Sequence, residues 1–200
     1  MWWCTEMEVE NAYKRKKQPE LVRRALLDQA ARITLEQGLS KVTFQAVADA
    51  TGVTKGGVMH HFATKNALIL EVFDDAMARF EAEVDAAMAK DPVPYGSFTR
   101  AYIDATISLG EKGQEEFDNQ ATLYVLMLGD SELRELWAQW ANEQLKKHEA
   151  TDNTETLCMV RLVADGIWLS DFSGINILDK QSLRNRLIRM TQRGFDESDE

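Results

Sequence analysis

The sequence predicts an all-α protein, and three observations support this fold class. The 200 residues include only 3 prolines and 11 glycines, so few positions interrupt a helix. Apolar residues recur every three or four positions along most of the chain, which is the period of an amphipathic helix. Threonine or aspartate precedes most of these periodic segments, where such side chains cap free backbone N–H groups.

The first helix is expected to begin at Pro19, because proline suits the first helical position. Gly38 ends this helix. Its apolar residues at helical spacing are Val22, Leu26, Ala30 and Ile33. Residues 1–18 show no such periodicity and end in the basic run Lys14–Lys17. We therefore predict a basic N-terminal arm over 1–18 that is disordered in the free protein.

Two short helices, over 44–51 and 54–61, and one long helix that ends at Asp91 are predicted next. Gly52 separates the two short helices. The N-caps of the three helices are Thr43, Thr54 and Thr64. The long helix carries a strong apolar stripe made of Leu70, Phe73, Met77, Phe80, Val84 and Met88. We place the boundary between two domains near the start of this long helix, so that they span 19–66 and 67–194.

Five further helices are predicted in the remainder of the chain, again from apolar residues at helical spacing. They cover about 98–109, about 117–128, a segment after Asp130 or Ser131, a segment that begins at Asp152 or Thr154, and a segment after Asp179. The fourth of these is apolar on nearly every side, so we expect it to be buried on more than one side. Residues 195–200 form an acidic tail.

The net charge of −10 is distributed unevenly along the chain. Residues 1–65 contain 10 Lys and Arg against 7 Asp and Glu, whereas residues 66–200 contain 13 against 26. A basic front on an acidic body is typical of a protein whose N-terminal part binds a polyanion.

Several other classes of protein lack support. The sequence shows no nucleophile–base arrangement, no glycine-rich phosphate loop and no cluster of metal ligands, so we expect neither an enzyme nor a cofactor or metal. Cys4 and Cys158 have no disulfide or zinc spacing, and are expected to be reduced. The acidic residues that follow Cys4 exclude a secretory signal, and the longest uncharged run, Asn119–Gly129, is too short to span a bilayer. The protein is expected to be cytoplasmic.

The two short helices and their glycine turn predict a helix-turn-helix. The second helix of such a motif enters the major groove of DNA with its N-terminal residues against base edges. Gly56 and Gly57 stand there, where bare backbone allows a close approach. Lys55 can reach a guanine or a phosphate, and hydroxyl and histidine side chains can bond phosphate oxygens.

The stretch "TFQAVADATGVTKGGVMHHFATKNAL" resembles the DNA-binding head of the TetR family of one-component transcriptional repressors. The match covers about 20–70 and includes "VADATGV", the "K-G-x-x-x-x-H-F" pattern and "x-K-x-A-L". The segment "DGIWLSD" is similar to a subgroup of multidrug-type regulators. The family has tyrosine where this chain has Met59, so one phosphate contact is expected to be missing, and the arm over 1–18 is expected to compensate by binding phosphate or the minor groove.

The motif and the resemblance together predict a set of residues that contact double-stranded operator DNA. They are Thr43, Gln45, Thr54, Lys55, Gly56, Gly57, His60, His61 and Lys65. His60 and His61 have two alternative interpretations, a metal pair and plain surface histidines. Adjacent residues on a helix do not face each other, which argues against the metal pair.

The resemblance implies that the acidic body binds a small inducer and forms a homodimer through its last two helices. The predicted ligand-binding residues are Phe73, Met77, Tyr102, Phe117, Tyr124, Met127, Trp137, Trp140 and Trp168. Such an aromatic and methionine-rich set suits a lipophilic ligand, and the acids Asp104, Glu116, Asp118 and Asp171 would suit a cation. The predicted dimerisation residues are Leu157, Val160, Val163, Ala164, Gly166, Ile167, Leu183, Leu187 and Met190.

The predicted function is that of a dimeric repressor that a small lipophilic or cationic ligand releases from its operator. Two alternatives stay open. The same fold could act as an activator or respond to something other than a small molecule. The chain could also be a helical interaction protein that binds no DNA, although the charge distribution and the helix-turn-helix argue against this. Aromatic stripes also often form an ordinary core rather than a pocket.

Overall fold

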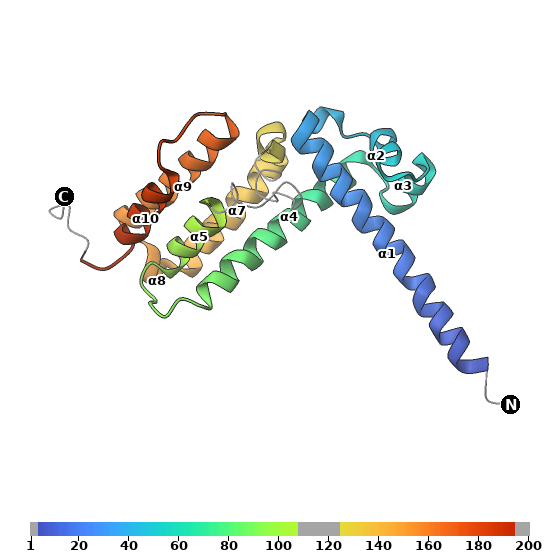
Figure 1. The fold of residues 1–200 in the computed structure, drawn as a ribbon, viewed down its shortest axis with the longest axis horizontal. Coiled ribbons are helices and arrows are strands. Elements are labelled where there is room, and N and C mark those ends of the chain that lie inside the picture. Colours follow the sequence, from blue (N-terminus) through green and yellow to red (C-terminus); the bar gives the residue numbers. More distant parts are fainter. Residues whose placement is uncertain (1–3, 108–124, 195–200) are drawn as a thin grey trace. The chain divides into compact units, whose positions relative to one another are not determined.

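The computed structural model describes the backbone of residues 4–107 and 125–194, and the side chains of 19–107, 125–170 and 173–194. Every regular element in these ranges is a helix, which confirms the predicted all-α fold (Figure 1). The chain divides into two compact units, Met1–Asp74 and Asp75–Glu200, which meet within one long helix. The predicted domain boundaries at 66 and 18 stay predictions.

The described part of the first unit contains three helices, a short 3-10 turn and the beginning of a fourth helix. These elements are α1 (Cys4–Gln37), η1 (Leu39–Lys41), α2 (Phe44–Thr51), α3 (Lys55–His61) and the first part of α4 (Lys65–Met88). α2 packs beside the C-terminal half of α1, and α3 packs against α2 (Figure 1). Apolar side chains from all four helices are buried, among them Leu26, Ala30, Val47, Val58, Phe62 and Leu68.

The prediction that α1 begins at Pro19 is wrong, as is the prediction that residues 4–18 are disordered. α1 begins at Cys4 and contains Pro19 in its interior. Proline removes one backbone hydrogen bond, which is why its position indicated a helix start. The residues on its N-terminal side are mostly Glu, Met, Lys, Arg and Ala, which have high helix propensity. The helix therefore continues across the proline.

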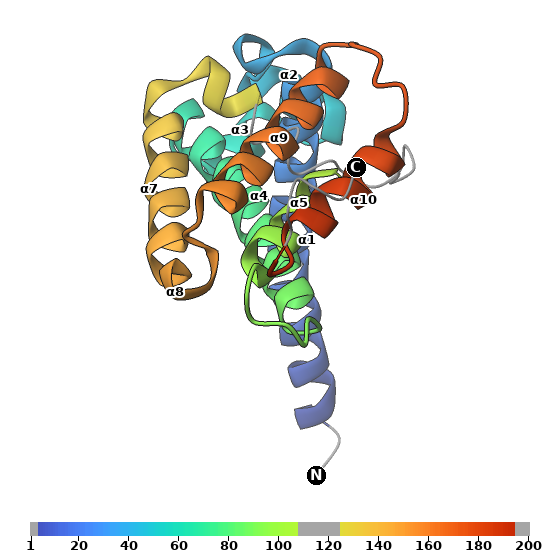
Figure 2. The ribbon, with the colours of Figure 1, turned by 90° about the vertical axis from the view of Figure 1, so that its left-hand side faces the viewer.

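Among the described residues, the second unit contains the remainder of α4 and five further helices. They are α5 (Ser97–Ile107), α7 (Ser131–Lys147), α8 (Glu149–Asp152), α9 (Glu155–Phe172) and α10 (Lys180–Met190). Within this unit α9 lies beside both α5 and α10 (Figure 2). Most of the helix predicted over 117–128 lies outside the described residues. Neither η1 nor α8 was predicted, because each is too short to show a helical period.

The predicted N-caps explain where most helices begin. The hydroxyl oxygens of Thr43, Thr54 and Thr64 each accept a hydrogen bond, at 3.0 Å, from the backbone N–H three residues later. The carboxylates of Asp130 and Asp179 do the same for α7 and α10. Such caps satisfy backbone donors that have no partner inside the helix.

One buried carboxylate holds α5 against α8. Asp152 is 2% exposed, and its Oδ1 accepts hydrogen bonds from the backbone N–H of Thr99 at 2.8 Å and from the Thr99 hydroxyl at 2.7 Å.

No helix in the described part of the chain is long and apolar enough to cross a membrane.

Candidate nucleic-acid interface

The turn between α2 and α3 depends on one glycine. Gly52 ends α2 in the left-handed region with φ of 73°, a conformation that side chains with a Cβ rarely adopt. Thr54 then caps α3. Val47, Val58 and Phe62 are at most 1% exposed and form the core beneath the two helices. The opposite face of α3 is therefore directed outward.

The first turn of α3 is open to an anionic partner. Lys55 and Gly56 are exposed, and Gly57 is half-buried. Thr54 accepts the N–H of Gly57 through its hydroxyl oxygen, but keeps its own O–H free to donate to a phosphate. Lys55 adds a positive charge to the positive end of the helix dipole, so this turn favours a phosphate or an electronegative base edge.

The two glycines of α3 have no structural requirement inside the chain. Neither has a positive φ. A Cβ built on Gly56 would meet only Thr54 Oγ1, at 3.9 Å, and a Cβ on Gly57 would meet Thr54 Oγ1 at 3.4 Å and Val53 Cβ at 3.8 Å. These are ordinary contact distances, so alanine would fit at both positions.

Besides the capping residues Thr43 and Thr54, two of the predicted DNA-contacting side chains already have partners within the chain. Gln45 donates one N–H of Nε2 to Asp49 at 2.7 Å, which leaves its second N–H and its carbonyl oxygen to contact a base. Lys65 Nζ lies 3.4 Å from the carbonyl oxygen of Leu39, an exposed interaction that a phosphate could replace.

The remaining predicted residues lie on the outward side of the motif. Thr43 and His60 are exposed and His61 is half-buried. The two imidazole rings are 5.7 Å apart at an interplanar angle of 70°.

Two further residues of the motif were not predicted to contact DNA. Met59 is 52% exposed and presents an apolar group on the outward face of α3. Such a group can contact the methyl of a thymine. Lys41 is an exposed cation in η1, two residues from the Leu39 carbonyl that Lys65 contacts. The only sequence signal for Lys41 was the basic excess of the first 65 residues.

Part of the predicted ligand-binding set gathers around an aromatic ring that was not predicted. Phe80 lies 5.9 Å from the ring of Tyr102, 5.7 Å from Trp137 and 5.5 Å from Trp140. The rings of Trp137 and Trp140 are 5.1 Å apart. Phe80 belongs to the apolar stripe that was predicted on α4, but that stripe did not indicate that Phe80 lies at the centre of this cluster.

The aromatic cluster extends to two more residues that sequence reasoning missed. Phe98 lies 6.1 Å from Tyr102 and stacks on His148 at 4.9 Å. Burial lowers the pKa of His148 below its usual value, and the charge of Lys147 acts in the same direction. Among the described residues, the buried His148 Nε2 and Trp140 Nε1 have no hydrogen-bond partner.

The other members of the predicted ligand set are dispersed. Phe73 is buried in the first unit, whereas Met127 and Trp168 are buried in the second and Met77 is half-buried there. Phe117 and Tyr124 lie outside the described residues, as do the side chains of Glu116, Asp118 and Asp171. Asp104 forms an ion pair with Arg184.

The predicted dimerisation residues come from two opposite faces of α9 and from α10. Leu157, Val160, Ala164 and Ile167 are at most 3% exposed, because they pack inside their own subunit. Val163 and Gly166 are exposed on the other face. On α10, Leu187 is buried, and Leu183 and Met190 are half-buried. Periodicity could not separate the two faces, since α9 is apolar on both.

Comparisons with known protein families agree with this architecture. Residues 26–72 match the family described as bacterial regulatory proteins, tetR family. Residues 96–192 match the family described as tetracyclin repressor-like, C-terminal domain. The two matches fall in the two parts of the chain that the fold separates.

Individual relatives are transcriptional regulators. The HTH-type transcriptional repressor KstR2 of Rhodococcus jostii (strain RHA1) is 27% identical over 158 residues, which cover 74% of this chain and 77% of that protein. The HTH-type transcriptional regulator AcrR of Shigella flexneri is 32% identical over 85 residues, covering 41% and 40% of the two chains.

Solved structures share the fold. A TetR-family member, SCO1917 from Streptomyces coelicolor A3, superposes with a TM-score of 0.65 at 22% identity, covering 86% of this chain and 98% of that one. The multidrug binding protein EbrR complexed with malachite green gives a TM-score of 0.63 at 22% identity, covering 85% and 98%. With its helix-turn-helix head and helical C-terminal domain, the chain belongs to the TetR family of DNA-binding transcriptional regulators.

Proposed function

We propose that this protein is a dimeric repressor that a small lipophilic or cationic ligand releases from its operator. The observation that carries the DNA-binding part is the open first turn of α3, with its exposed Lys55 and two glycines that the chain itself does not require. KstR2 is itself a transcriptional repressor.

In this proposal the helix-turn-helix and the start of α4 contact both the bases and the phosphates of the operator. Lys55 and Gln45 read base edges, and Gly56 and Gly57 allow the helix backbone to approach the groove. Thr43, Thr54 and Lys65 bond phosphates, together with His60 and His61. These phosphate contacts position the motif, and the base contacts select the sequence.

The exposed apolar face of α9 supports a dimer. Met159, Leu162, Val163 and Leu169 are 41–64% exposed, and with Gly166 they recur at helical spacing on one side of the helix. Exposed apolar surface of this kind marks a protein–protein interface. We place the dimer contact on this face rather than on the buried face that contains Leu157 and Val160.

The aromatic cluster supports a lipophilic or cationic ligand. The indole rings of Trp137 and Trp140 offer faces for cation–π attraction. One acid contacts the cluster, since the Tyr102 hydroxyl donates to Asp165 Oδ1 at 2.6 Å. The related fold of EbrR has been solved with malachite green and with ethidium, both aromatic cations. A ligand of that chemistry would suit rings with a carboxylate beside them.

Release from DNA requires two conformations with different affinities for the ligand. In one conformation the α3 helices of the two subunits lie about 34–36 Å apart, which is one turn of DNA. The ligand binds the other conformation better and moves the heads out of register. α4 would transmit this change, because its residues belong to both units.

The test of DNA binding is a fluorescence-anisotropy titration against tiled duplexes from the DNA that flanks the protein's own gene. Tight binding to one near-palindromic tile, lost in Lys55→Gln, is the expected result. Lys146→Gln serves as a control, because Lys146 is an exposed cation on α7. If no duplex binds even at low salt, the proposal is wrong.

The dimer and the ligand are tested separately. Leu162→Glu is expected to give a monomer by light scattering, whereas Leu145→Glu, at an exposed leucine of α7, is expected to leave the dimer intact. Malachite green is expected to quench tryptophan fluorescence and to release the bound duplex, less so in Asp165→Asn. Quenching without release would contradict a role as inducer site.

A further inference from the structure

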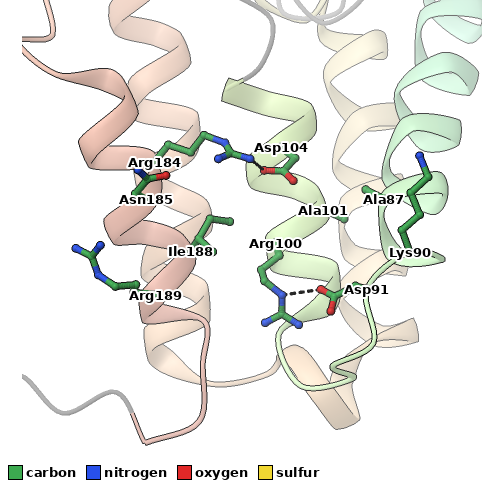
Figure 3. A pocket seen from close by; sticks show the side chains of 10 residues that line it. All are labelled: Ala87, Lys90, Asp91, Arg100, Ala101, Asp104, Arg184, Asn185, Ile188 and Arg189. Atoms are coloured by element: carbon green, nitrogen blue, oxygen red, sulfur yellow. Dashed lines mark hydrogen bonds and ion pairs between the residues drawn. The ribbon is translucent and has the colours of Figure 1, made fainter.

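A polar pocket in the second unit lies apart from the aromatic cluster. It has a volume of about 430 Å³ and opens between the C-terminal end of α4, α5 and α10 (Figure 3). Its charged lining residues are Lys90, Asp91, Arg100, Asp104, Arg184 and Arg189. None of the aromatic and methionine residues predicted to bind the inducer lines this pocket, whereas Asp104, one of the acids predicted to suit a cation, does.

Two arginines of the pocket are held in place by the chain. Arg100 donates to Asp91 Oδ2 at 2.6 Å, to the carbonyl oxygen of Val93 at 2.6 Å and to Thr191 Oγ1 at 3.1 Å. Arg184 extends from α10 to Asp104 on α5 (Figure 3). These two pairs use both carboxylates of the pocket, and they fix the two guanidinium groups in position.

The other two cations remain without a counter-charge. Lys90 and Arg189 are exposed, and neither side chain has a hydrogen bond or ion pair among the described residues. The four cations of the pocket therefore exceed its two carboxylates by two charges. This excess is local, because residues 66–200 contain 26 acidic residues against 13 basic ones.

The sequence around Arg184 and Arg189 strengthens this local excess. Residues 180–193 contain five Lys and Arg and no Asp or Glu. Such a strongly basic segment is unusual in an acidic domain, and its position beside a pocket concentrates the field where a ligand could enter.

We propose that this pocket binds a small metabolite that carries at least two negative charges on phosphoryl or carboxylate groups. Lys90 and Arg189 would donate to the anionic groups, while the remaining N–H groups of Arg184 would orient one of them. The volume lies within the range of ligand pockets and exceeds what a single phosphate needs. The site is a second one, distinct from the proposed inducer site.

The test is isothermal titration calorimetry of the full-length protein with pyrophosphate and, separately, with citrate, at low and at high salt. The double variant Lys90→Gln/Arg189→Gln is expected to bind about tenfold or more weakly than the unaltered chain. Arg186→Gln removes a charge from the same helix outside the pocket lining, and is expected to change the affinity less than about twofold. Preference for pyrophosphate would identify phosphoryl groups as the ligand chemistry, and preference for citrate would identify carboxylates.

The DNA-binding head could also bind polyanions, so a variant of the head accompanies the series. Lys55→Gln is expected to leave pyrophosphate and citrate binding unchanged. The proposal is overturned if the Lys55 variant, and not the pocket variant, loses the binding. It is equally overturned if neither anion binds at low salt. Because Lys90 and Arg189 are exposed, both pocket substitutions should leave the thermal unfolding midpoint nearly unchanged, which a melting curve checks.

Discussion

Replacement of Gly56 or Gly57 by alanine is expected to stabilise the protein and to weaken its binding to DNA. Alanine in place of glycine favours a helix by up to about 1 kcal/mol, and the gain requires that the added Cβ fits. At Gly56 the nearest atom to that Cβ is 3.9 Å away, so the full gain is expected. At Gly57 the Cβ would lie 3.4 Å from the capping oxygen of Thr54, so the gain should be smaller.

In the proposed complex the same methyl groups would add bulk to the first turn of α3, where the backbone approaches the groove. They would hold the backbone and Lys55 away from the bases, and one good base contact contributes about 1–3 kcal/mol of discrimination. We therefore expect the affinity for the best-binding duplex to fall about tenfold or more. Thermal unfolding measures the first effect, with a rise of about 2–4 °C per kcal/mol for a chain of this size, and anisotropy titration measures the second.

A contrasting variant separates the two effects. Gly52→Ala introduces a side chain at φ of 73°, where nothing lies within 4 Å but the left-handed backbone itself disfavours a Cβ. This variant should be destabilised by about 1–2 kcal/mol. If Gly56→Ala raises the melting temperature and leaves the affinity for DNA unchanged, close approach of the backbone to DNA does not explain the glycines.

Three other predictions concern single residues. Met59→Tyr restores a hydroxyl on α3 that can donate to a phosphate, so the affinity for the best-binding duplex should rise about tenfold; the slope of log affinity against log salt should stay unchanged because tyrosine carries no charge, and an unchanged affinity would mean that no contact forms. Gly96→Ala should destabilise by about 2 kcal/mol or more in chemical denaturation, because its φ is +73° and a Cβ would lie 2.6 Å from the carbonyl oxygen of Thr191; wild-type stability would show that the loop relaxes at no cost. Because burial lowers the pKa of His148, its neutral form stabilises the fold above about pH 6.5, and this contribution should be lost as the pH falls through the lowered pKa. This is checked by the melting temperatures of the unaltered protein and of His148→Phe from about pH 7.5 to about pH 5, the range in which histidine titrates. Equal pH dependence in both proteins would contradict the prediction.

Most of the head could be predicted from its sequence, because its features depend on short-range interactions. Thr43 and Thr54 cap their helices because each hydroxyl oxygen accepts a hydrogen bond from the backbone N–H three residues later. A glycine after a short apolar helix specifies a turn, as at Gly52. The start of α1 was an exception. Pro19 predicted the N-terminus of the helix, but the residues before it favour a helix and α1 continues through them.

The second unit could be predicted only in part, because its site residues meet across long separations in sequence. Tyr102 and Asp165 are 63 residues apart, and their hydrogen bond depends on how α5 packs against α9. Phe80 had the same apolar spacing as its neighbours on α4, yet only packing placed it among Trp137 and Trp140. No local pattern indicated either arrangement.

By itself, the sequence determined the helical fold class, the caps, the helix-turn-helix and the division into a basic front and an acidic body, since periodicity, capping and charge are properties of neighbouring residues. Only the tertiary structure decided which face of α9 is buried, because Leu157 and Leu162 are equally apolar and their exposure depends on where α5 lies. It also brought Lys90, in the turn after α4, and Arg189, on α10, to one pocket although they are about a hundred residues apart in the chain. Burial and charge proximity follow from packing, and packing joins residues that the sequence keeps apart.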